Sequence, residues 1–438
     1  MASLFSFVFV FGVLVFVHEL GHFAAAKWVG IRVLKFQLGF NPVIVRFRRG
    51  DTEYCIGALP FGGFVKMAGE DLGEQQPGDA STLSSKSKWK RLQVLVMGPV
   101  MNLLLAVVLT ALVLHAGRDV PAYQYQTATV GRVLAGSPAA SAGIRAGDVA
   151  VRVSDRAVAT WQDVDVAVAA QPPDRDVVLV LRRNEGELTL RLGPAGSTPR
   201  GNWLRPLGLF PVTRPQLVAV NAGGSADRAG LRTGDTVVAL DSRPIVSDVT
   251  FRETIAAHPG QPLTLTVLRS GQRSDIVVVP SAEGRIGVTT MEETSVHKLA
   301  LAASVEASVR ENARDAAEIF ETLWGIATRK VSPRQIMGPI GIAQLSVQSA
   351  QLGWLPLLSL MAMLSLNLGI VNLLPIPVLD GGYIAIMALE GLARRDFSIR
   401  VKQRMMMAGL AALVMLMSTA LYNDLLRISW VERLIPWR

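Results

Sequence analysis

Apolar residues gather in four long runs along the chain, and polar residues lie between the runs. The runs cover about residues 2–26, 92–117, 354–379 and 405–422. The second and third contain no Asp, Glu, Lys or Arg, and the fourth is shorter but uniformly apolar. Because about 20 apolar residues suffice to cross the hydrocarbon core of a bilayer, the pattern predicts four transmembrane helices. A buried helix of a soluble domain is the alternative for each run.

The first run also has the length of a signal peptide. No basic residue precedes it, however, and no small-residue cleavage site follows it. We therefore expect this run to remain in the protein as its first span.

The long segment between the second and third runs has short Val and Leu stretches, frequent Gly and Pro, and mixed charge. It contains a repeat, in which residues 135–148 align with residues 222–235 and eight of the fourteen positions are identical. Alternating strands follow each copy. The repeat predicts two tandem α+β domains, over residues 121–212 and 213–292, inserted between spans two and three.

Each repeat resembles the S-x-A-x-x-A-G-[IL]-x-x-G-D segment of bacterial PDZ domains. The resemblance implies domains that bind extended peptides or the C-termini of proteins by adding a strand to a sheet edge. The alternative is a pair of spacers without an open groove, because the motif marks a fold and not an occupied pocket.

Residues 293–353 connect these domains to the third run. Apolar residues recur at spacings of three and four over residues 298–329, with charged residues between them. This spacing predicts an amphipathic helix. It would lie against the second α+β domain or on the membrane surface, or it would pack as an ordinary core helix.

The net charge is +9, and two of the connections between the runs are rich in basic residues. Eleven lie between the first two runs and five between the last two. By the positive-inside rule both connections are cytoplasmic, including a loop over about residues 32–70, and the α+β domains are outside. The two membrane parts are then residues 1–120 and 354–438. In a membrane protein this charge predicts no nucleic-acid partner, and the single Cys55 excludes an intramolecular disulfide.

A short polar cluster interrupts the first run, where residues 18–22 read HELGH. His18 and His22 are four residues apart and project from one helix face, so that two imidazoles can bind one zinc ion. Glu19 lies beside them and can take a proton from a zinc-bound water. Ionisable side chains inside a span are costly and functional by default. The alternative is a buried histidine pair that is satisfied by its neighbours.

Catalytic zinc usually has three protein ligands and a water, so a third ligand is needed at the same depth. The remaining histidines all fall on the outer side in the predicted topology. Asp380 comes at the inner end of the third run, which is also where HELGH lies in the first. Pro375 and Pro377 break the helix just before it, which is tolerated where a helix lines a cavity. Asp380 is therefore the predicted third ligand.

HELGH in the first span, N-x-x-P-x-P-x-L-D-G at residues 372–381 and the PDZ-like repeat between them together resemble the site-2 proteases. These are intramembrane zinc metalloproteases, and the arrangement is most similar to the RseP type, the regulator of sigma-E protease. The resemblance covers essentially the whole sequence. It implies that His18, His22 and Asp380 bind Zn²⁺ and that Glu19 activates water.

The same resemblance implies how a substrate is held. Asn372 and Asn367 would hold the substrate or stabilise an oxyanion. Asn102 is a further candidate, with a hydrogen bond between helices as its alternative. A strand over residues 56–67 would belong to a membrane-associated hairpin and pair with the unwound substrate. The residues expected to contact the substrate there are Gly62, Gly63 and Phe64.

The implied substrates are single-span membrane proteins that another protease has already trimmed, such as an anti-sigma factor in envelope-stress signalling, and also remnant signal peptides. The implied location is a bacterial inner membrane, with PDZ domains in the periplasm that screen access and an active site near the cytoplasmic side. The sequence departs from many relatives in having fewer glycines over residues 36–41 and Tyr383 in place of His. Neither change removes a predicted ligand.

A second class of function stays open, which is a non-catalytic PDZ membrane scaffold or receptor with a structural metal site. Structural zinc has four protein ligands, whereas the sequence offers three and a well-placed glutamate. A metal transporter would carry polar residues through several spans, whereas here they cluster at one depth. Both comparisons favour catalysis.

Overall fold

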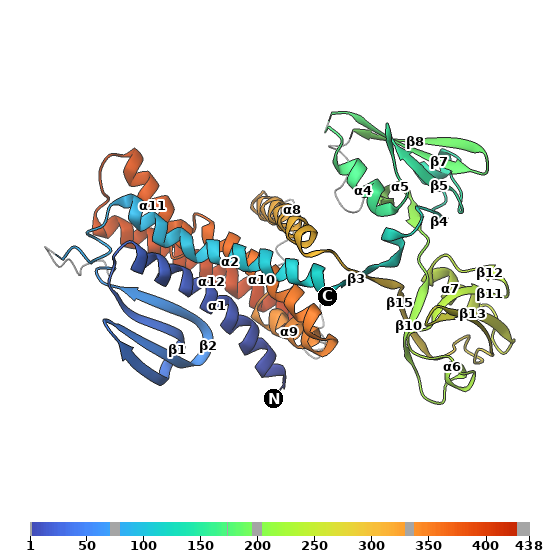
Figure 1. The fold of residues 1–438 in the computed structure, drawn as a ribbon, viewed down its shortest axis with the longest axis horizontal. Helices are drawn as coiled ribbons and strands as arrows, with labels where there is room; N and C mark the ends of the chain where they lie inside the picture. Colours follow the sequence, from blue (N-terminus) through green and yellow to red (C-terminus); the bar gives the residue numbers. More distant parts are fainter. Residues whose placement is uncertain (1, 71–78, 173, 195–203, 329–336, 427–438) are drawn as a thin grey trace. The chain divides into compact units, whose positions relative to one another are not determined.

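The computed structural model describes residues 2–70, 79–172, 174–194, 204–328 and 337–426. The protein divides into two compact units. The first unit comprises Met1–Arg118 and Lys298–Arg438, and the second comprises Asp119–His297. Long helices and one β-hairpin make up the first unit, whereas most of the strands belong to the second (Figure 1).

The first unit is built from long apolar helices, with α2 packed against both α1 and α10. Its helices are α1 (Ala2–Trp28), α2 (Lys88–Ala116), α8 (Leu301–Ala327), α9 (Pro339–Leu352), α10 (Trp354–Leu373), α11 (Asp380–Leu392) and α12 (Ile399–Leu426). Among the described residues, four of these helices, α1, α2, α10 and α12, are long and apolar enough to cross a membrane. The prediction of four spans is therefore confirmed.

Two spans differ in extent from the sequence prediction. The third was expected to reach residue 379, but α10 ends at Leu373 because Pro375 forces the residue before it out of the helical region. Leu374 accordingly has φ −65° and ψ 146°. The fourth was expected over residues 405–422, but its helix continues into polar residues at both ends. Helix α9 was not predicted and lies in the segment that had been assigned to a connector.

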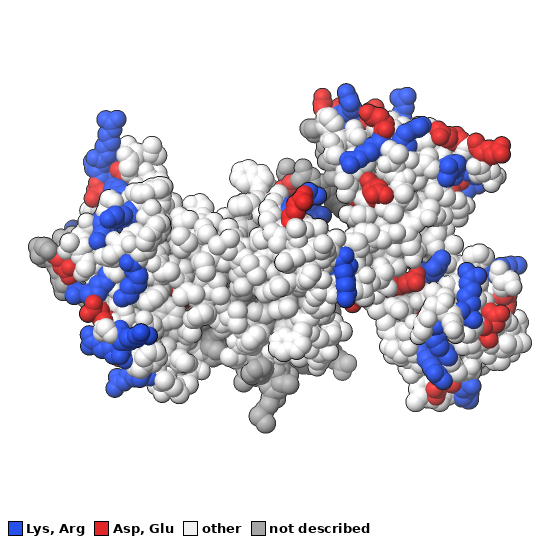
Figure 2. Space-filling view, in the orientation of Figure 1, with Lys and Arg blue, Asp and Glu red and all other residues white. Residues whose placement is uncertain are grey.

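Basic side chains gather at one end of the first unit. Figure 2 shows Lys and Arg gathered at the end that carries the hairpin and α11, while most of the remaining visible surface of this unit is uncharged. Basic side chains at this end include Arg46, Arg48, Lys90, Arg394 and Arg395. A span body without exposed charge is what a hydrocarbon environment requires.

Strands β1 (Val33–Arg49) and β2 (Thr52–Met67) form an antiparallel hairpin in the loop predicted over residues 32–70. Val33, Phe36 and Val65 join a buried cluster with residues of α1 and α2, so the base of the hairpin is anchored to the helices. Cys55 is buried in β2. Away from the base the hairpin exposes several large apolar side chains, namely Phe40, Ile44, Val45, Phe47 and Ile56.

Helix α8 corresponds to the amphipathic helix predicted over residues 298–329. It packs on α2, and its contact face carries the buried side chains of Ser304 and Ser308. The Asn312 amide donates a hydrogen bond to Oγ1 of Thr110 on α2, at 3.2 Å. The sequence left open whether this helix lies against the second α+β domain, lies on the membrane surface or packs as a core helix. The structure shows α8 packed on a helix of its own unit.

The second unit contains two modules, each with its own apolar core, one around Trp161 and one around Phe251. The first module has strands β4 (Val130–Val133), β5 (Val149–Val153), β6 (Arg156–Ala157), β7 (Asp176–Arg183), β8 (Gly186–Pro194) and β9 (Leu209–Pro211) with helices α3 (Pro138–Ser141), α4 (Trp161–Ala169) and α5 (Leu204–Leu207). The second has β10 (Pro215–Val220), β11 (Thr236–Leu240), β12 (Arg243–Pro244), β13 (Leu263–Arg269), β14 (Gln272–Val278) and β15 (Val288–Glu292) with helices α6 (Ser225–Arg228) and α7 (Asp248–Ala256). Strands β3 (Arg118–Pro121) and β16 (Thr294–His297) pair separately, and a short 3₁₀ helix, η1 (Ala122–Tyr125), follows β3.

The last residue of the sequence repeat makes the same interaction in both modules. Asp148 is fully buried and receives two hydrogen bonds from the Arg183 guanidinium, at 2.6 and 2.7 Å. Asp235 is fully buried and receives two from Arg269, both at 2.7 Å. The repeat in the sequence is therefore also a repeat of structure.

Candidate metal centre

Three predicted ligand side chains meet at one point of the first unit. His18 and His22 lie one turn apart on α1, and Asp380 begins α11. The Nε2 atoms of the two histidines are 3.2 Å apart. Oδ2 of Asp380 lies 3.3 Å from Nε2 of His18 and 3.4 Å from Nε2 of His22. The three atoms thus form a nearly equilateral triangle.

The distances between these three atoms can be compared with the distances between ligand atoms in a zinc site. Zinc binds imidazole nitrogen and carboxylate oxygen at about 2.0–2.1 Å in a tetrahedron, so neighbouring ligand atoms are about 3.3 Å apart. The three observed edges match that value. Three ligands leave one tetrahedral position for water or substrate, as in catalytic and not structural zinc sites.

The interruption between α10 and α11 brings Asp380 to the histidines. After Pro375 and Pro377 the backbone folds back so closely that a side chain at Gly381 would overlap the carbonyl oxygen atoms of Leu373 and Leu374. Only glycine fits such an approach. The D-G-G sequence at the start of α11 therefore permits the turn that positions the Asp380 carboxylate.

Helix α2 fixes the two histidines from behind. Nδ1 of His22 lies 2.9 Å from the carbonyl oxygen of Val94 and donates to it, so that Nε2 is left free to bind a metal. Nδ1 of His18 lies 3.2 Å from the side-chain amide of Asn102, which is fully buried. Asn102 therefore makes a hydrogen bond between helices, which was one of the two interpretations of the sequence.

Glu19 is almost completely buried and lines a cavity of about 800 Å³ together with the three candidate ligands. Gly63 of β2 lies directly beside it, since a Cβ atom added at Gly63 would come 3.3 Å from Cγ of Glu19. Gly62 and Phe64 also line this cavity. The strand segment predicted to contact substrate is thus next to the predicted catalytic carboxylate.

The two predicted asparagines on α10 lie in different surroundings. The amide nitrogen of Asn372 is 3.5 Å from Nε2 of His18 and the residue lines the cavity. Asn367 lies five residues earlier on α10, and among the described residues it is not part of the cavity lining. Tyr383, which departs from the expected His, does line the cavity.

The far wall of the cavity carries a charged group that the sequence reasoning did not identify. Glu390 of α11 is 3% exposed, and its carboxylate accepts a hydrogen bond from Lys402 of α12 at 2.8 Å. Lys88 of α2 lies 3.7 Å from the same carboxylate and 2.7 Å from that of Asp396. The signal in the sequence was a single acidic residue in an otherwise apolar stretch. These ion pairs join α2, α11 and α12 around the cavity.

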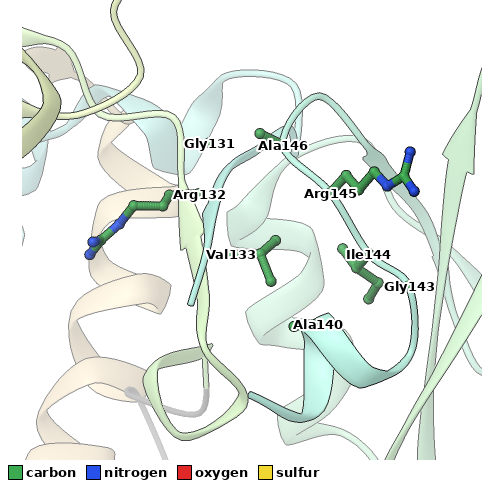
Figure 3. Close-up of a pocket in the computed structure, with 8 residues that line it drawn as sticks. All are labelled: Gly131, Arg132, Val133, Ala140, Gly143, Ile144, Arg145 and Ala146. Carbon is green, nitrogen blue, oxygen red and sulfur yellow. The ribbon is translucent and has the colours of Figure 1, made fainter. Parts of the chain in front are cut away.

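A second cavity, of about 470 Å³, lies in the first module of the other unit between β4 and the segment around α3. Figure 3 shows Val133, Ala140 and Ile144 facing one another there, while the side chains of Arg132 and Arg145 extend away from them. This lining offers no acid, base or nucleophile directed at a common point, so we do not assign chemistry to it.

A triangle of ligand atoms of zinc dimensions, a carboxylate beside it and a cavity among membrane-length helices are together the features of a membrane metallohydrolase. Residues 6–416 match the profile of peptidase family M50, and the chain belongs to that family. The protein is thus a zinc metalloprotease, and the resemblance drawn from the motifs is confirmed.

Relatives along the whole sequence agree with this assignment. The chain is 31% identical to a candidate zinc metalloprotease of Neisseria meningitidis serogroup A, over 98% of this chain and 100% of that protein. It is 32% identical to another from Ralstonia nicotianae, over 98% and 99%. It is 30% identical to the regulator of sigma-E protease RseP of Salmonella typhimurium, over 97% and 99%.

Proposed function

We propose that this protein hydrolyses peptide bonds within the membrane spans of single-span proteins that another protease has already trimmed, an anti-sigma factor being the substrate type. Remnant signal peptides are a second substrate of the same form. The observation that carries the proposal is the triangle of His18, His22 and Asp380 beside Glu19, in a cavity among helices of membrane length. The likeness to the regulator of sigma-E protease supports the choice of substrate.

Each part of the site has a task in this reaction. His18, His22 and Asp380 would hold Zn²⁺, which when bound would supply Lewis acidity toward a water and the scissile carbonyl. Glu19 would accept a proton from the attacking water and return it to the leaving amine nitrogen. Asn372 has an amide group near the ligands and donates a hydrogen bond to the oxygen on which negative charge develops. Asn367 is kept as a weaker candidate for the same role.

The hairpin gives a reason why a helical substrate can be cut. A peptide bond in a helix is hidden from a nucleophile, so the substrate must become extended near Glu19. The Gly63–Met67 part of β2 pairs with β1 on one side only among the described residues, whereas Glu53–Ile56 pairs with β1 on both sides. The β2 segment Gly62–Phe64 lines the cavity, and a substrate strand can add to its other edge.

We propose that this chemistry takes place near the cytoplasmic face of a bacterial inner membrane. The basic residues lie at the end of the first unit that holds the hairpin and α11, which favours a cytoplasmic position for that end (Figure 2). The modules at residues 121–212 and 213–292 are then periplasmic. Strand β15 ends the sheet of the second module, and in the described part of the chain no further strand pairs with its outer edge, so a peptide could add there. As PDZ domains the two modules screen substrates by their trimmed ends.

The test is cleavage of a tagged, trimmed single-span substrate in a bacterial strain that lacks its own enzyme of this type. Glu19→Gln should abolish the product, with protein level and zinc content unchanged. Glu318→Gln, an exposed position on α8, serves as the matched control and should cleave like wild type. Equal processing by wild type and Glu19→Gln would overturn the catalytic assignment and return the scaffold interpretation.

A further inference from the structure

The side chain of Asn102 is buried beside the metal centre with half of its hydrogen-bonding capacity unused. Its amide nitrogen lies 3.2 Å from Nδ1 of His18. Its Oδ1 atom is buried and has no hydrogen-bond partner among the described residues. An unpaired buried polar atom costs about 1–3 kcal/mol, so such an atom next to a functional site calls for an explanation.

The chemistry of histidine supplies the explanation. A neutral imidazole that binds a metal through Nε2 carries its proton on Nδ1, and a protonated Nδ1 needs an acceptor. The amide nitrogen of Asn102 is a donor only and cannot fill that need. It suits the other tautomer, in which Nδ1 accepts and Nε2 donates to Oδ2 of Asp380, 3.3 Å away.

The two histidines therefore differ in what holds them. His22 faces the backbone carbonyl of Val94, which can only accept and thus admits only the metal-binding tautomer. His18 faces a side-chain amide, which can present either its oxygen or its nitrogen after a half-turn. The backbone of Asn102 is anchored, because its carbonyl accepts a hydrogen bond from Ser365 of α10 at 2.8 Å. The half-turn is thus confined to the amide group.

We propose that Asn102 is a positioning residue that sets the tautomer of His18. With metal bound, the amide presents Oδ1 to the Nδ1–H of His18 and holds Nε2 toward the metal. Without metal, the amide turns its nitrogen to Nδ1, and His18 Nε2 donates to Asp380. This inference rests on the proposed zinc site and adds a device by which Nδ1 of His18 keeps a hydrogen-bond partner in both states.

The test uses two substitutions of similar shape in the purified full-length protein in detergent. Asn102→Asp can only accept a hydrogen bond, and Asn102→Leu can do neither. Asn312→Leu is the control, because Asn312 is a buried asparagine that joins α8 to α2 away from the metal centre. Zinc affinity is measured by competition with a chromophoric chelator, and folding by thermal unfolding.

We expect Asn102→Asp to bind zinc at least as tightly as wild type. Asn102→Leu should bind about 10–100-fold more weakly, the usual effect of losing a partner of a metal-bound histidine. The control should stay close to wild type. Equal affinities for wild type and Asn102→Leu would overturn the inference, as would weak binding by a folded Asn102→Asp protein. Wild-type protein that fails to bind zinc would instead overturn the proposed site itself.

A direct reading of the tautomer removes any dependence on how well the variants fold. In protein labelled with ¹⁵N-histidine, zinc removal from wild type should move the proton of His18 from Nδ1 to Nε2, while His22 keeps its proton on Nδ1. In Asn102→Asp the proton of His18 should remain on Nδ1 in both states. A His18 that keeps one tautomer in wild type with and without zinc would refute the switch.

Discussion

Replacement of Gly98 by alanine is the sharpest test of how the metal centre is packed. Gly98 lies on α2 directly against the ring of His22. A methyl group there would come 2.5 Å from Cε1 and 2.9 Å from Cδ2 of the ring, and closer still to Nε2. Carbon atoms in van der Waals contact are about 3.5–4.0 Å apart, so the ring would have to move by about 1 Å.

The displaced atom is the one that we propose binds the metal. The ring of His22 cannot move freely away from the added methyl group, because its Nδ1 is hydrogen-bonded to the Val94 carbonyl and the ring is buried. A misplacement of about 1 Å costs about 10²-fold in catalytic rate. We therefore expect Gly98→Ala to lower cleavage by about 10²-fold and to weaken zinc binding, although alanine favours a helix by about 1 kcal/mol over glycine.

The assay combines zinc competition, cleavage of a trimmed single-span substrate and thermal unfolding. Gly12→Ala on α1 is the matched control, because a methyl group at that position would have no neighbour within 4 Å. It should leave zinc binding and cleavage unchanged. Wild-type zinc affinity and activity in Gly98→Ala would refute the reasoning, since the ring of His22 could then not rest against this glycine.

Three further outcomes can be checked on the same protein. A zinc chelator should abolish cleavage and zinc should restore it, with a lower unfolding temperature in between because bound metal stabilises only the folded state. Arg269→Met should destabilise the second module by about 3 kcal/mol, measured by urea unfolding with limited proteolysis, because it leaves the Asp235 carboxylate buried and unpaired. Burial alone raises the pKa of Asp235 and Asp148, but hydrogen bonds from arginine and a backbone N–H outweigh it and lower both pKa values. The stability that these two carboxylates add is therefore complete above the unfolded-state pKa of about 3.9, and it is lost as pH falls through their folded-state pKa. Limited proteolysis at a series of pH values from roughly 2 to 7 would measure this loss. Unchanged protease resistance at acid pH would contradict this account.

The sequence allowed the spans and the ligand set to be predicted for two different reasons. Run length alone decides whether a helix can cross a bilayer, so the four spans followed from apolar content. The ligands followed from the i, i+4 spacing of His18 and His22 and from the depth at which Asp380 comes in the third run. Run length, residue spacing and position within a run are each properties of a single segment, so the pattern along the sequence is enough to predict them.

The close approaches that complete the site could not be predicted in this way. Nothing in the local sequence says that Gly98 meets His22, that Gly63 meets Glu19, or that Glu390 meets Lys402, since each pair is separated by tens of residues or joins different elements. The end of α10 was mispredicted for a related reason, because apolar content continues past Leu373 while the helix stops at the prolines.

These close contacts share one feature, which explains how a zinc site can be rigid inside a mobile bilayer. Backbone without side chains is pressed against the catalytic groups from two sides, by α2 at Gly98 behind His22 and by β2 at Gly63 beside Glu19. Side chains at these two positions would need space that the site does not have. The predicted ligand His22 and the predicted base Glu19 are thus held by close backbone contacts, which leave these two side chains little freedom to lose when metal binds. The open side is left to Asn372 and the cavity, so rigidity at the metal and access for an extended peptide come from different walls of the same site.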